Sequence, residues 1–184
     1  MSGVVVCDYG AGNTRSVRVA LADLGHESTL SSDPDLLENA GLVILPGVGS
    51  ARQAMTHLNE TGAAEAIRSR FSRGLTILGI CLGMQLALEY SEEDDGVRTL
   101  GLLSGTVRRI EAVRVPRLGW ATVEPWGGSY YFAHSYACES PTAVARSEGV
   151  TAAVESGAFL GVQFHPEKSG DAGRRWLATC LSPV

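Results

Sequence analysis

The stretch Leu75-Thr76-Ile77-Leu78-Gly79-Ile80-Cys81-Leu82-Gly83-Met84 sets the fold of the chain around it. Its first six residues are mostly apolar and predict a buried strand. The Gly-x-Cys-x-Gly sequence then predicts a sharp turn, because the residues two before and two after the turning residue must be small. A helix is expected next, over 84–90. The stretch is therefore a strand–turn–helix unit that carries a thiol at its turn.

Two other apolar runs, Val4–Cys7 and Leu42–Leu45, also predict buried strands. Helical patterns come between and after these strands: 14–24 with a cap at Asn13 or Thr14, the segment after Asp33-Pro34, and 50–71 with a break near 61–62. Apolar strands that alternate with helices predict βαβ units and a parallel sheet covered on both faces.

The pattern changes after Ser91, where an acidic turn at 92–96 precedes short strand-like segments at 106–110, 120–123, 130–133, 143–146 and 159–164. These segments predict antiparallel hairpins added to the parallel sheet, and 171–181 predicts a closing helix. The expected fold class is α/β, a mostly parallel sheet flanked by helices with antiparallel strands added in the C-terminal half. No repeat or linker is evident, so residues 1–184 are expected to form a single domain.

Composition excludes several classes of protein. The chain has 184 residues, 45% of them hydrophobic, which is enough for one well-cored domain. A net charge of -5 and a pI of about 5.4 make a nucleic-acid role unlikely. No apolar stretch reaches the length of a membrane span, and the N-terminal residues do not form a signal peptide, so a cytoplasmic protein is expected. The four histidines show no metal-ligand spacing, and no metal site is expected.

Cys81 stands apart from the other three cysteines, Cys7, Cys138 and Cys180, because glycines flank it. The cysteines match neither a disulfide framework nor a metal pattern. A thiol on such a turn lies near a helix N-terminus, where the dipole and free amides favour the thiolate. The Leu82 amide can then point at a developing oxyanion. The alternative is a buried cysteine beside two turn glycines.

A second chemical segment is Gln163-Phe164-His165-Pro166-Glu167. Alternate residues of a strand face the same side, so the imidazole of His165 and the carboxylate of Glu167 are expected to lie together. The carboxylate can hold one ring nitrogen while the other takes the thiol proton. Alone, the segment could be a turn with a surface histidine. Beside the cysteine turn, it completes a nucleophile, a base and an orienting acid.

Two glycine-containing loops remain. Pro46-Gly47-Val48-Gly49-Ser50 follows a buried strand and is expected beside Cys81, because strand ends on one edge of a parallel sheet lie close together. Its glycines could let a backbone amide approach a substrate oxygen, although it could equally be an ordinary turn. Gly10-Ala11-Gly12-Asn13 lacks both the dinucleotide fingerprint and the P-loop lysine, so nucleotide binding is not expected.

In this order, the segments resemble those of class I, triad-type glutamine amidotransferases, whose two signatures match 79–85 and 164–167. Several more segments resemble the glutaminase subunit of imidazole glycerol phosphate synthase: Asp8-Tyr9-Gly10-Ala11-Gly12-Asn13, Pro46-Gly47-Val48-Gly49, Pro116-Arg117-Leu118-Gly119-Trp120, 131–136 and 161–170. The resemblance covers the chain nearly from end to end.

The resemblance implies a flavodoxin-like fold and the hydrolysis of glutamine to glutamate and ammonia through a glutamyl thioester, with no cofactor. By this resemblance Cys81 attacks the side-chain amide, His165 moves protons and Glu167 orients His165. The remaining site residues that it implies are, for the oxyanion hole, Leu82, Val48 and Gly49, and for glutamine binding, Gln85, Glu93, Ser135, Tyr136 and Gly47. Without the family, Glu93 would be interpreted as part of a solvated acidic turn.

The same resemblance implies a partner, a (βα)₈-barrel cyclase subunit that forms a heterodimer with this chain and uses the ammonia in histidine biosynthesis. The residues that it places at or near the partner face are Asn13, Arg15, Trp120, Tyr131 and Lys168. Without the family, Trp120 and Tyr131 would be interpreted as core aromatics. We also hypothesise that the peptide before Val48 points the wrong way at rest, and that the partner turns its amide inward.

The chain departs from the family pattern at a few positions, notably Arg117 in place of histidine and Ala121 in place of asparagine, which puts details of the interface in doubt. Three alternatives stay open at this point. They are an amidotransferase that serves a different synthase, a cysteine peptidase or γ-glutamyl hydrolase, and a redox sensor that uses Cys81.

Overall fold

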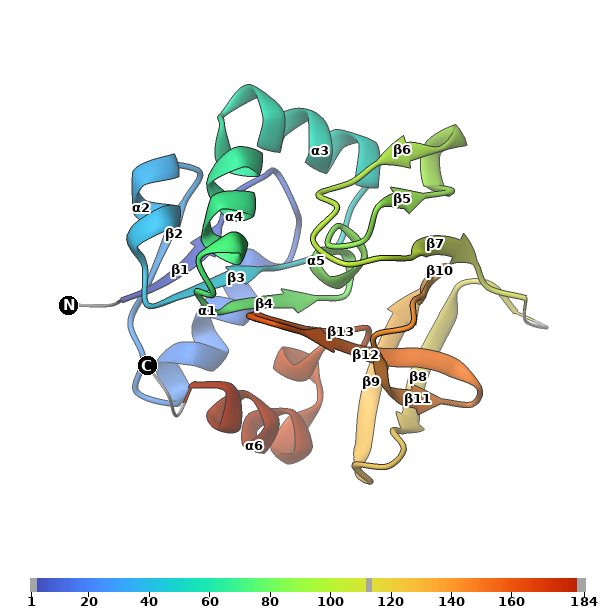
Figure 1. Ribbon diagram of the computed structural model, residues 1–184. Helices are drawn as coiled ribbons and strands as arrows, with labels where there is room; N and C mark the ends of the chain where they lie inside the picture. The colour runs from blue at the N-terminus through green and yellow to red at the C-terminus, as the bar shows by residue number, and fades with distance from the viewer. Residues whose placement is uncertain (1–2, 112–113, 182–184) are drawn as a thin grey trace.

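The computed structural model describes residues 3–111 and 114–181, and its centre is a seven-stranded sheet (Figure 1). The strands follow the order β11-β12-β13-β4-β3-β1-β2. Their bounds are β1 Val4–Cys7, β2 Ser28–Ser31, β3 Leu42–Leu45, β4 Ile77–Ile80, β11 Ala143–Ser147, β12 Val150–Ser156 and β13 Phe159–Val162. Strands β2, β1, β3, β4 and β13 pair in parallel, while β12 and β11 extend the sheet as antiparallel strands.

Helices cover both faces of this sheet. Helices α2, α3 and α4 lie on one side of it, and α1 and α6 lie on the other (Figure 1). The helices are α1 Thr14–Asp23, α2 Pro34–Asn39, α3 Ala51–Glu60, α4 Ala63–Ser72, α5 Leu82–Gln85 and α6 Gly170–Leu181. The predicted cap at Asp33 is confirmed, because its side chain accepts a hydrogen bond from the Asp35 amide at 2.9 Å.

The unbroken apolar runs of the strands follow from this two-sided burial. In β1, Val4 and Val6 pack toward α1 and α6, whereas Val5 and Cys7 pack toward α2, α3 and α4. β3 divides in the same way, with Leu42 and Ile44 on one face and Val43 and Leu45 on the other. A strand buried on both faces has no solvent side on which a polar residue would be favoured.

Two smaller sheets lie beyond the C-terminal ends of the parallel strands. One has the order β10-β7-β5-β6 and the other pairs β8 with β9. Their bounds are β5 Tyr90–Ser91, β6 Val97–Arg98, β7 Thr106–Arg109, β8 Arg117–Thr122, β9 Ser129–His134 and β10 Tyr136–Glu139. The predicted antiparallel additions are therefore confirmed, although β13, predicted as one of them, also pairs in parallel with β4. The strands β2, β5, β6, β10 and β12 were not predicted from the sequence. Short 3₁₀ helices cover Glu93–Asp95 (η1) and Pro166–Lys168 (η2).

The helix predicted over 84–90 is wrong. The helix α5 ends at Gln85, and β5 begins at Tyr90. The carbonyls of residues 86–89 accept hydrogen bonds from amides in the segment 99–103, at distances between 2.8 and 3.2 Å. An α-helix would need these carbonyls for its own ladder. A partner segment distant in sequence therefore ends the helix despite its helical pattern.

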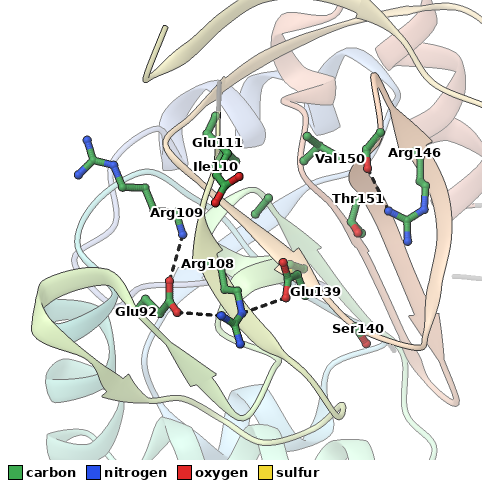
Figure 2. Close-up of a pocket in the computed structure, with 13 residues that line it drawn as sticks. Glu92, Arg108, Arg109, Ile110, Glu111, Glu139, Ser140, Arg146, Val150 and Thr151 are labelled. Atoms are coloured by element: carbon green, nitrogen blue, oxygen red, sulfur yellow. Dashed lines mark hydrogen bonds and ion pairs between the residues drawn. The ribbon is translucent and has the colours of Figure 1, made fainter. Parts of the chain in front are cut away.

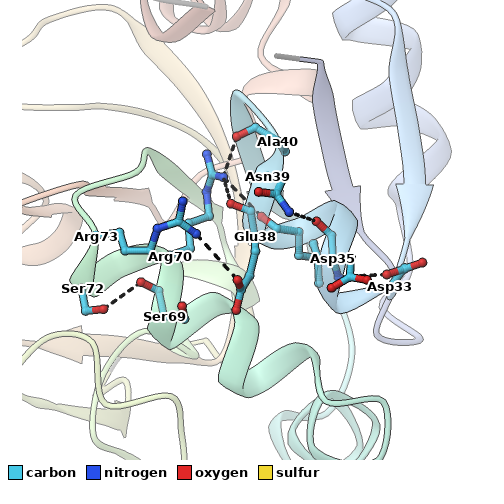
Figure 3. Close-up of polar contacts among 10 residues, drawn as sticks. Asp33, Asp35, Glu38, Asn39, Ala40, Ser69, Arg70, Ser72 and Arg73 are labelled. Atoms are coloured by element: carbon cyan, nitrogen blue, oxygen red, sulfur yellow. Dashed lines mark hydrogen bonds and ion pairs between the residues drawn. The ribbon is translucent and has the colours of Figure 1, made fainter. Parts of the chain in front are cut away.

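One buried cation fixes the packing of α2 and α4. Arg70 is 0% exposed, and its guanidinium donates to the carbonyls of Leu37, Ala40, Gly41 and Thr76, among others. Figure 3 shows this side chain beside Glu38 and Ala40 at the end of α2. Burial lowers the pKa of Arg70 to about 10, with the nearby Arg73 adding to the effect. The Leu37, Glu38 and Ala40 carbonyls at the end of α2 are therefore satisfied by this single side chain.

The strand order also fixes where a ligand site can form. The parallel strands run β2-β1-β3-β4-β13, which is the flavodoxin-like order with its switch point between β1 and β3. Ligands in such sheets bind beyond the carboxyl ends of the strands near that point. The loops after β1, β3 and β4 meet there, and the last of them begins at Cys81.

Candidate active site

Cys81 occupies the sharp turn that the sequence predicts. Its backbone has φ 51° and ψ -104°, a conformation that costs a non-glycine residue about 1–3 kcal/mol. The flanking glycines are required by space. A Cβ on Gly83 would lie 1.9 Å from the Leu45 carbonyl oxygen, and one on Gly79 would lie 2.7 Å from the Met84 nitrogen. The turn therefore holds the thiol in a strained, fixed position.

Backbone hydrogen bonds bring the second segment to this turn. The Cys81 amide donates to the Val162 carbonyl at 2.7 Å, which joins the end of β4 to the end of β13. The His165 amide donates to the Tyr131 carbonyl at 2.9 Å, and the Ser169 hydroxyl donates to the His165 carbonyl at 2.6 Å. The main chain of His165 is thus held from both sides.

His165 and Glu167 form the predicted pair. The His165 Nδ1 lies 2.7 Å from the Glu167 Oε1, and both side chains are fully buried. Burial alone would lower the pKa of His165, but the Cys81 thiol and the Glu167 carboxylate outweigh it and raise the pKa to about 9. The His165 Nε2 is buried and has no hydrogen-bond partner among the described residues. The Cys81 thiol is therefore close enough to raise the pKa of the His165 ring, although no well-aligned hydrogen bond joins the two groups. Such loose geometry is common in catalytic sites without substrate.

A cavity of about 250 Å³ opens beside Cys81. All eight residues predicted for oxyanion or glutamine binding line it: Gly47, Val48, Gly49, Leu82, Gln85, Glu93, Ser135 and Tyr136. Pockets for drug-sized ligands span roughly 300–1,000 Å³, so this one favours a smaller molecule.

The loop after β3, Pro46–Ser50, lies against the turn at Cys81, which we call the elbow. The Gly47 carbonyl of this loop faces the Leu82 amide, which is the predicted oxyanion donor. The Leu82 amide donates to the Gly47 carbonyl at 3.3 Å. Since the Gly47 carbonyl and the Val48 amide belong to one peptide, the Val48 N–H points away from that position. The loop is held from behind, where the Gly12 amide donates to the Val48 carbonyl at 2.8 Å and the Tyr9 hydroxyl donates to the Pro46 carbonyl.

Two of the polar residues that line the cavity are themselves held in place. The Gln85 Nε2 donates to the Tyr136 carbonyl at 2.8 Å. The Glu93 carboxylate accepts from the Ala51 amide at 2.9 Å, at the start of α3. Burial raises the pKa of Glu93, the Ala51 amide partly offsets it, and Asp94 adds to the rise. Glu93 is therefore a half-buried group that faces the cavity, and the interpretation as a solvated turn is wrong.

Three polar side chains of this region were missed or differently assigned from the sequence. The Gln163 Nε2 donates to the Cys81 Sγ at 3.4 Å. Asn13, predicted at the partner face, donates to the Glu167 Oε1. His134 lines the cavity with a buried Nε2 that has no partner in the described chain. The alternation that linked His165 to Glu167 also reaches Gln163, so that signal was available.

The residues predicted for a partner face are partly exposed. Trp120 on β8 is 57% exposed, so the interpretation as a core aromatic is wrong for it. Its ring packs edge-on against Tyr131 of β9 at 6.0 Å. Leu118, also on β8, is 65% exposed. Arg15 and Lys168 are exposed as well.

The other three thiols are unsuited to nucleophilic chemistry. Burial raises the pKa of Cys7 to about 12, with Asp8 adding to it, and burial raises the pKa of Cys180 to about 12, with a further contribution from Glu155. Burial also raises the pKa of Cys138. These residues are therefore protonated thiols at neutral pH.

Comparison with known sequences identifies the family of this chain. The family model for class-I glutamine amidotransferases matches residues 5–182. The chain belongs to this family. The imidazole glycerol phosphate synthase subunit HisH of Thermus thermophilus is 43% identical over 187 residues, which cover 95% of this chain and 94% of that protein. HisH of Xylella fastidiosa is 44% identical over 199 residues, which cover 98% of each chain.

Solved structures show the same fold for this amidotransferase. A crystal structure of a glutamine amidotransferase aligns with a TM-score of 0.81 at 24% identity, over 99% of this chain and 100% of that one. PurLQS from Thermotoga maritima aligns with a TM-score of 0.72 at 22% identity, over 98% of each chain. At these identities the likeness concerns the fold alone.

The departure from the family pattern at Arg117 concerns packing within this amidotransferase. Its guanidinium lies 4.4 Å above the Phe132 ring and donates to the Ser147 hydroxyl and the Glu148 carboxylate, both at 2.9 Å. Arg117 therefore joins β8 to the turn between β11 and β12. Ala121 packs against the cluster around Val123.

A larger hollow of about 590 Å³ lies away from the elbow (Figure 2). Arginine and glutamate side chains line it in equal number, and Figure 2 shows the Arg108 guanidinium between the carboxylates of Glu92 and Glu139. Cys138 also lines it, but its thiol has a raised pKa. The hollow is thus balanced in charge and lacks an activated nucleophile.

The described part of the amidotransferase contains neither a membrane-spanning helix nor a cluster of metal-binding side chains. Among residues 3–111 and 114–181, no helix is long and apolar enough to cross a bilayer. The same residues contain no cluster of histidine, cysteine and acidic side chains that could hold a metal ion.

Proposed function

We propose that this chain hydrolyses glutamine to glutamate and ammonia as the glutaminase subunit of imidazole glycerol phosphate synthase. Membership of the class-I amidotransferase family and 41–44% identity to HisH subunits over nearly the whole chain support this function. The observation that carries it is the meeting of the Cys81 elbow with the buried His165–Glu167 pair beside one small cavity.

The reaction follows from the positions of these groups. The His165 Nε2 takes the thiol proton, and the Cys81 sulfur attacks the side-chain carbonyl carbon of glutamine. Glu167 holds Nδ1 and stabilises the imidazolium. His165 then gives the proton to the leaving nitrogen, and ammonia departs from a glutamyl thioester. Water activated by His165 cleaves the thioester, which releases glutamate and restores the thiol.

The cavity residues would bind the substrate. We assign the ammonium group of glutamine to Glu93 and its carboxylate to the backbone at Ser135 and Tyr136. Gln85 and the Gly47 backbone complete the binding site. The Leu82 amide, with an amide at Val48 or Gly49, would form the oxyanion hole.

The loop at Val48 would keep the enzyme slow until it is needed. The Gly47 carbonyl lies on the Leu82 amide, so an oxyanion would meet an oxygen rather than the Val48 N–H. One missing oxyanion donor costs about a hundred- to a thousandfold in rate. We propose that a (βα)₈-barrel cyclase, in a heterodimer with this chain, turns the peptide and receives the ammonia. Its docking face would include Asn13, Arg15, Trp120, Tyr131 and Lys168.

Glutamate release from glutamine tests this function. It is measured for the chain alone, and then with the cyclase and its ribonucleotide ligand. We expect a low rate alone that rises greatly in the complex. Cys81→Ala should abolish both rates, whereas Cys180→Ala, a matched change of a remote thiol, should leave both unchanged. No release in either state would refute the glutaminase, and full activity of the isolated chain would refute the gating by the partner.

A further inference from the structure

Gln163 is 0% exposed and joins the nucleophile to the wall of the cavity. Its Nε2 donates to the Cys81 Sγ at 3.4 Å, and its Oε1 accepts from the Gln85 Nε2 at 3.0 Å. The Gln85 Nε2 also donates to the Tyr136 carbonyl at 2.8 Å. A single chain of hydrogen bonds therefore runs from the sulfur to the strand β10.

The direction of this chain is fixed by its far end. A backbone carbonyl can only accept, so Gln85 must present its amide nitrogen to Tyr136. The same nitrogen also donates to Gln163, which must therefore accept with its side-chain oxygen. Only the Nε2 of Gln163 is then left to face Cys81. The assignment of oxygen and nitrogen in both amides follows from the network.

This donor has few competitors near the sulfur. The helix after Cys81 has only four residues, Leu82–Gln85, so its dipole is much weaker than a full helix would provide. The first amide of that helix, Leu82 N–H, already donates to the Gly47 carbonyl. A side-chain N–H that is fully buried and aimed at the sulfur favours the thiolate, because a hydrogen bond to a charged acceptor is stronger than one to a neutral acceptor.

We propose that Gln163 is a positioning residue of the glutaminase, whose N–H holds the Cys81 sulfur and stabilises it as a thiolate once the proton has moved to the His165 Nε2. The inference rests on the proposed function for its role in turnover. Its effect on the thiol is independent of any substrate. By holding Gln85 through its oxygen, Gln163 also couples the state of the nucleophile to the glutamine-binding side of the cavity.

Three other titratable groups influence Cys81: His165 at the end of β13, Tyr9 at the end of β1 and Cys138 on β10. Burial raises the pKa of Tyr9 and of Cys138, so both stay neutral up to at least pH 9. Glu93 and His134 line the same cavity as Cys81, and they titrate below pH 9 together with His165. These groups are common to the wild type and to Gln163→Met, so a difference in alkylation between those two proteins reflects the hydrogen bond from Gln163.

The test measures alkylation of Cys81 by iodoacetamide between pH 5 and 10 in the full chain, with the modified peptide quantified by mass spectrometry. Gln163→Met removes the donor and the acceptor at similar volume. Gln163→Glu keeps an acceptor for Gln85 but replaces the donor. Gln53→Met, on the exposed side of α3, is the matched control. Thermal unfolding followed by circular dichroism establishes that each variant is folded.

We expect both Gln163 variants to lower the alkylation rate at pH 7 by about ten- to a hundredfold, the range for losing one hydrogen bond to a charged group. The rate should recover toward the wild-type value at high pH, where the thiolate forms without help. In the glutaminase assay, Gln163→Glu should lower kcat and leave KM nearly unchanged, whereas Gln163→Met should also raise KM through Gln85.

A folded Gln163→Glu variant with the wild-type pH profile of alkylation would overturn the inference. A lower rate that persists unchanged at high pH would overturn it too, because blocked access and not thiolate stability would then be the cause. Failure of the proposed function would look different. The wild type would release no glutamate in any state, while its alkylation profile and the shift in the variants could still be measured.

Discussion

Gly83→Ala tests the geometry of the elbow most directly. Gly83 is the second residue of α5 and lies under the end of β3. A Cβ at this position would lie 1.9 Å from the oxygen, 2.6 Å from the carbonyl carbon and 2.8 Å from the Cβ of Leu45. Real Cβ atoms essentially never come within 3.0 Å of a heavy atom from elsewhere in the chain. Two of these three contacts are to the backbone, so no change of rotamer can relieve the clash.

The cost follows from the movement that is required. An ordinary contact of at least 3.4 Å would need α5 and β3 to separate by about 1.5 Å, in a region where both are fully buried. Overpacking in a core typically costs 1–3 kcal/mol and sometimes more. Because backbone must move here, we expect a loss of about 3 kcal/mol or more in the free energy of unfolding. The Pro46–Ser50 loop begins where β3 ends, so the oxyanion side of the cavity should be displaced as well.

Urea unfolding of Gly83→Ala, with Gly3→Ala as the control, measures this cost. A Cβ on Gly3 would meet nothing within 4 Å, so that variant should be within about 0.5 kcal/mol of the wild type. Glutamate release by the complex with the cyclase should fall at least a hundredfold for Gly83→Ala, because misplacement by about 1 Å has that effect. A Gly83→Ala protein that is as stable and as active as the wild type would refute the account of the elbow.

Two further predictions concern buried basic side chains. Arg70→Met should lower the free energy of unfolding, measured in urea, by about 3–5 kcal/mol, because it leaves several buried carbonyls without partners. The control Arg73→Met should cost at most about 1 kcal/mol, since Arg73 is half exposed and its ion pair with Glu38 spans 3.6 Å. Equal losses in the two variants would contradict the role given to Arg70. Burial lowers the pKa of His134 to about 4, despite its hydrogen bond to the Tyr136 carbonyl. As the pH falls, this histidine is therefore protonated in the unfolded chain before it is protonated in the folded one. Its contribution to the free energy of unfolding is full above pH 6.5 and is lost as the pH falls toward 4. The loss should reach about 2–3 kcal/mol between pH 7 and pH 4.5 in urea titrations, and His134→Asn, which keeps a donor for that carbonyl, should remove this part of it; an unchanged pH dependence would count against the assignment.

The parts of the fold that the sequence predicts are those set by local rules. The strands Val4–Cys7, Leu42–Leu45 and Ile77–Ile80 are short apolar runs, and such runs have few alternatives when helical patterns separate them. The elbow at Cys81 was predictable because the steric demand for small neighbours appears directly in the sequence. The pairing of His165 with Glu167 needs only the alternation of a strand and a proline to end it.

The parts that the sequence does not predict depend on distant segments. Residues 86–89 have a helical pattern, but amides from 99–103 take their carbonyls. The exposure of Trp120 depends on β8 pairing only with β9, which no local pattern reveals. The bond from Asn13 to Glu167 joins residues more than 150 positions apart, so a side chain assigned to a partner face also supports the triad.

The hydrogen bond that holds the loop at Val48 in its present orientation contributes little by itself. One hydrogen bond, from the Leu82 amide to the Gly47 carbonyl at 3.3 Å, holds the peptide against the oxyanion position. A net contribution of about 0.5–1.5 kcal/mol is typical for such a bond. The bond from Gly12 to the Val48 carbonyl belongs to the next peptide and can persist when the first one turns. Under the proposed function, a partner that favours the turned state by about 1–3 kcal/mol, twice the contribution of this bond, would therefore reverse the population that the bond sets, and a coupling energy of this size is ordinary.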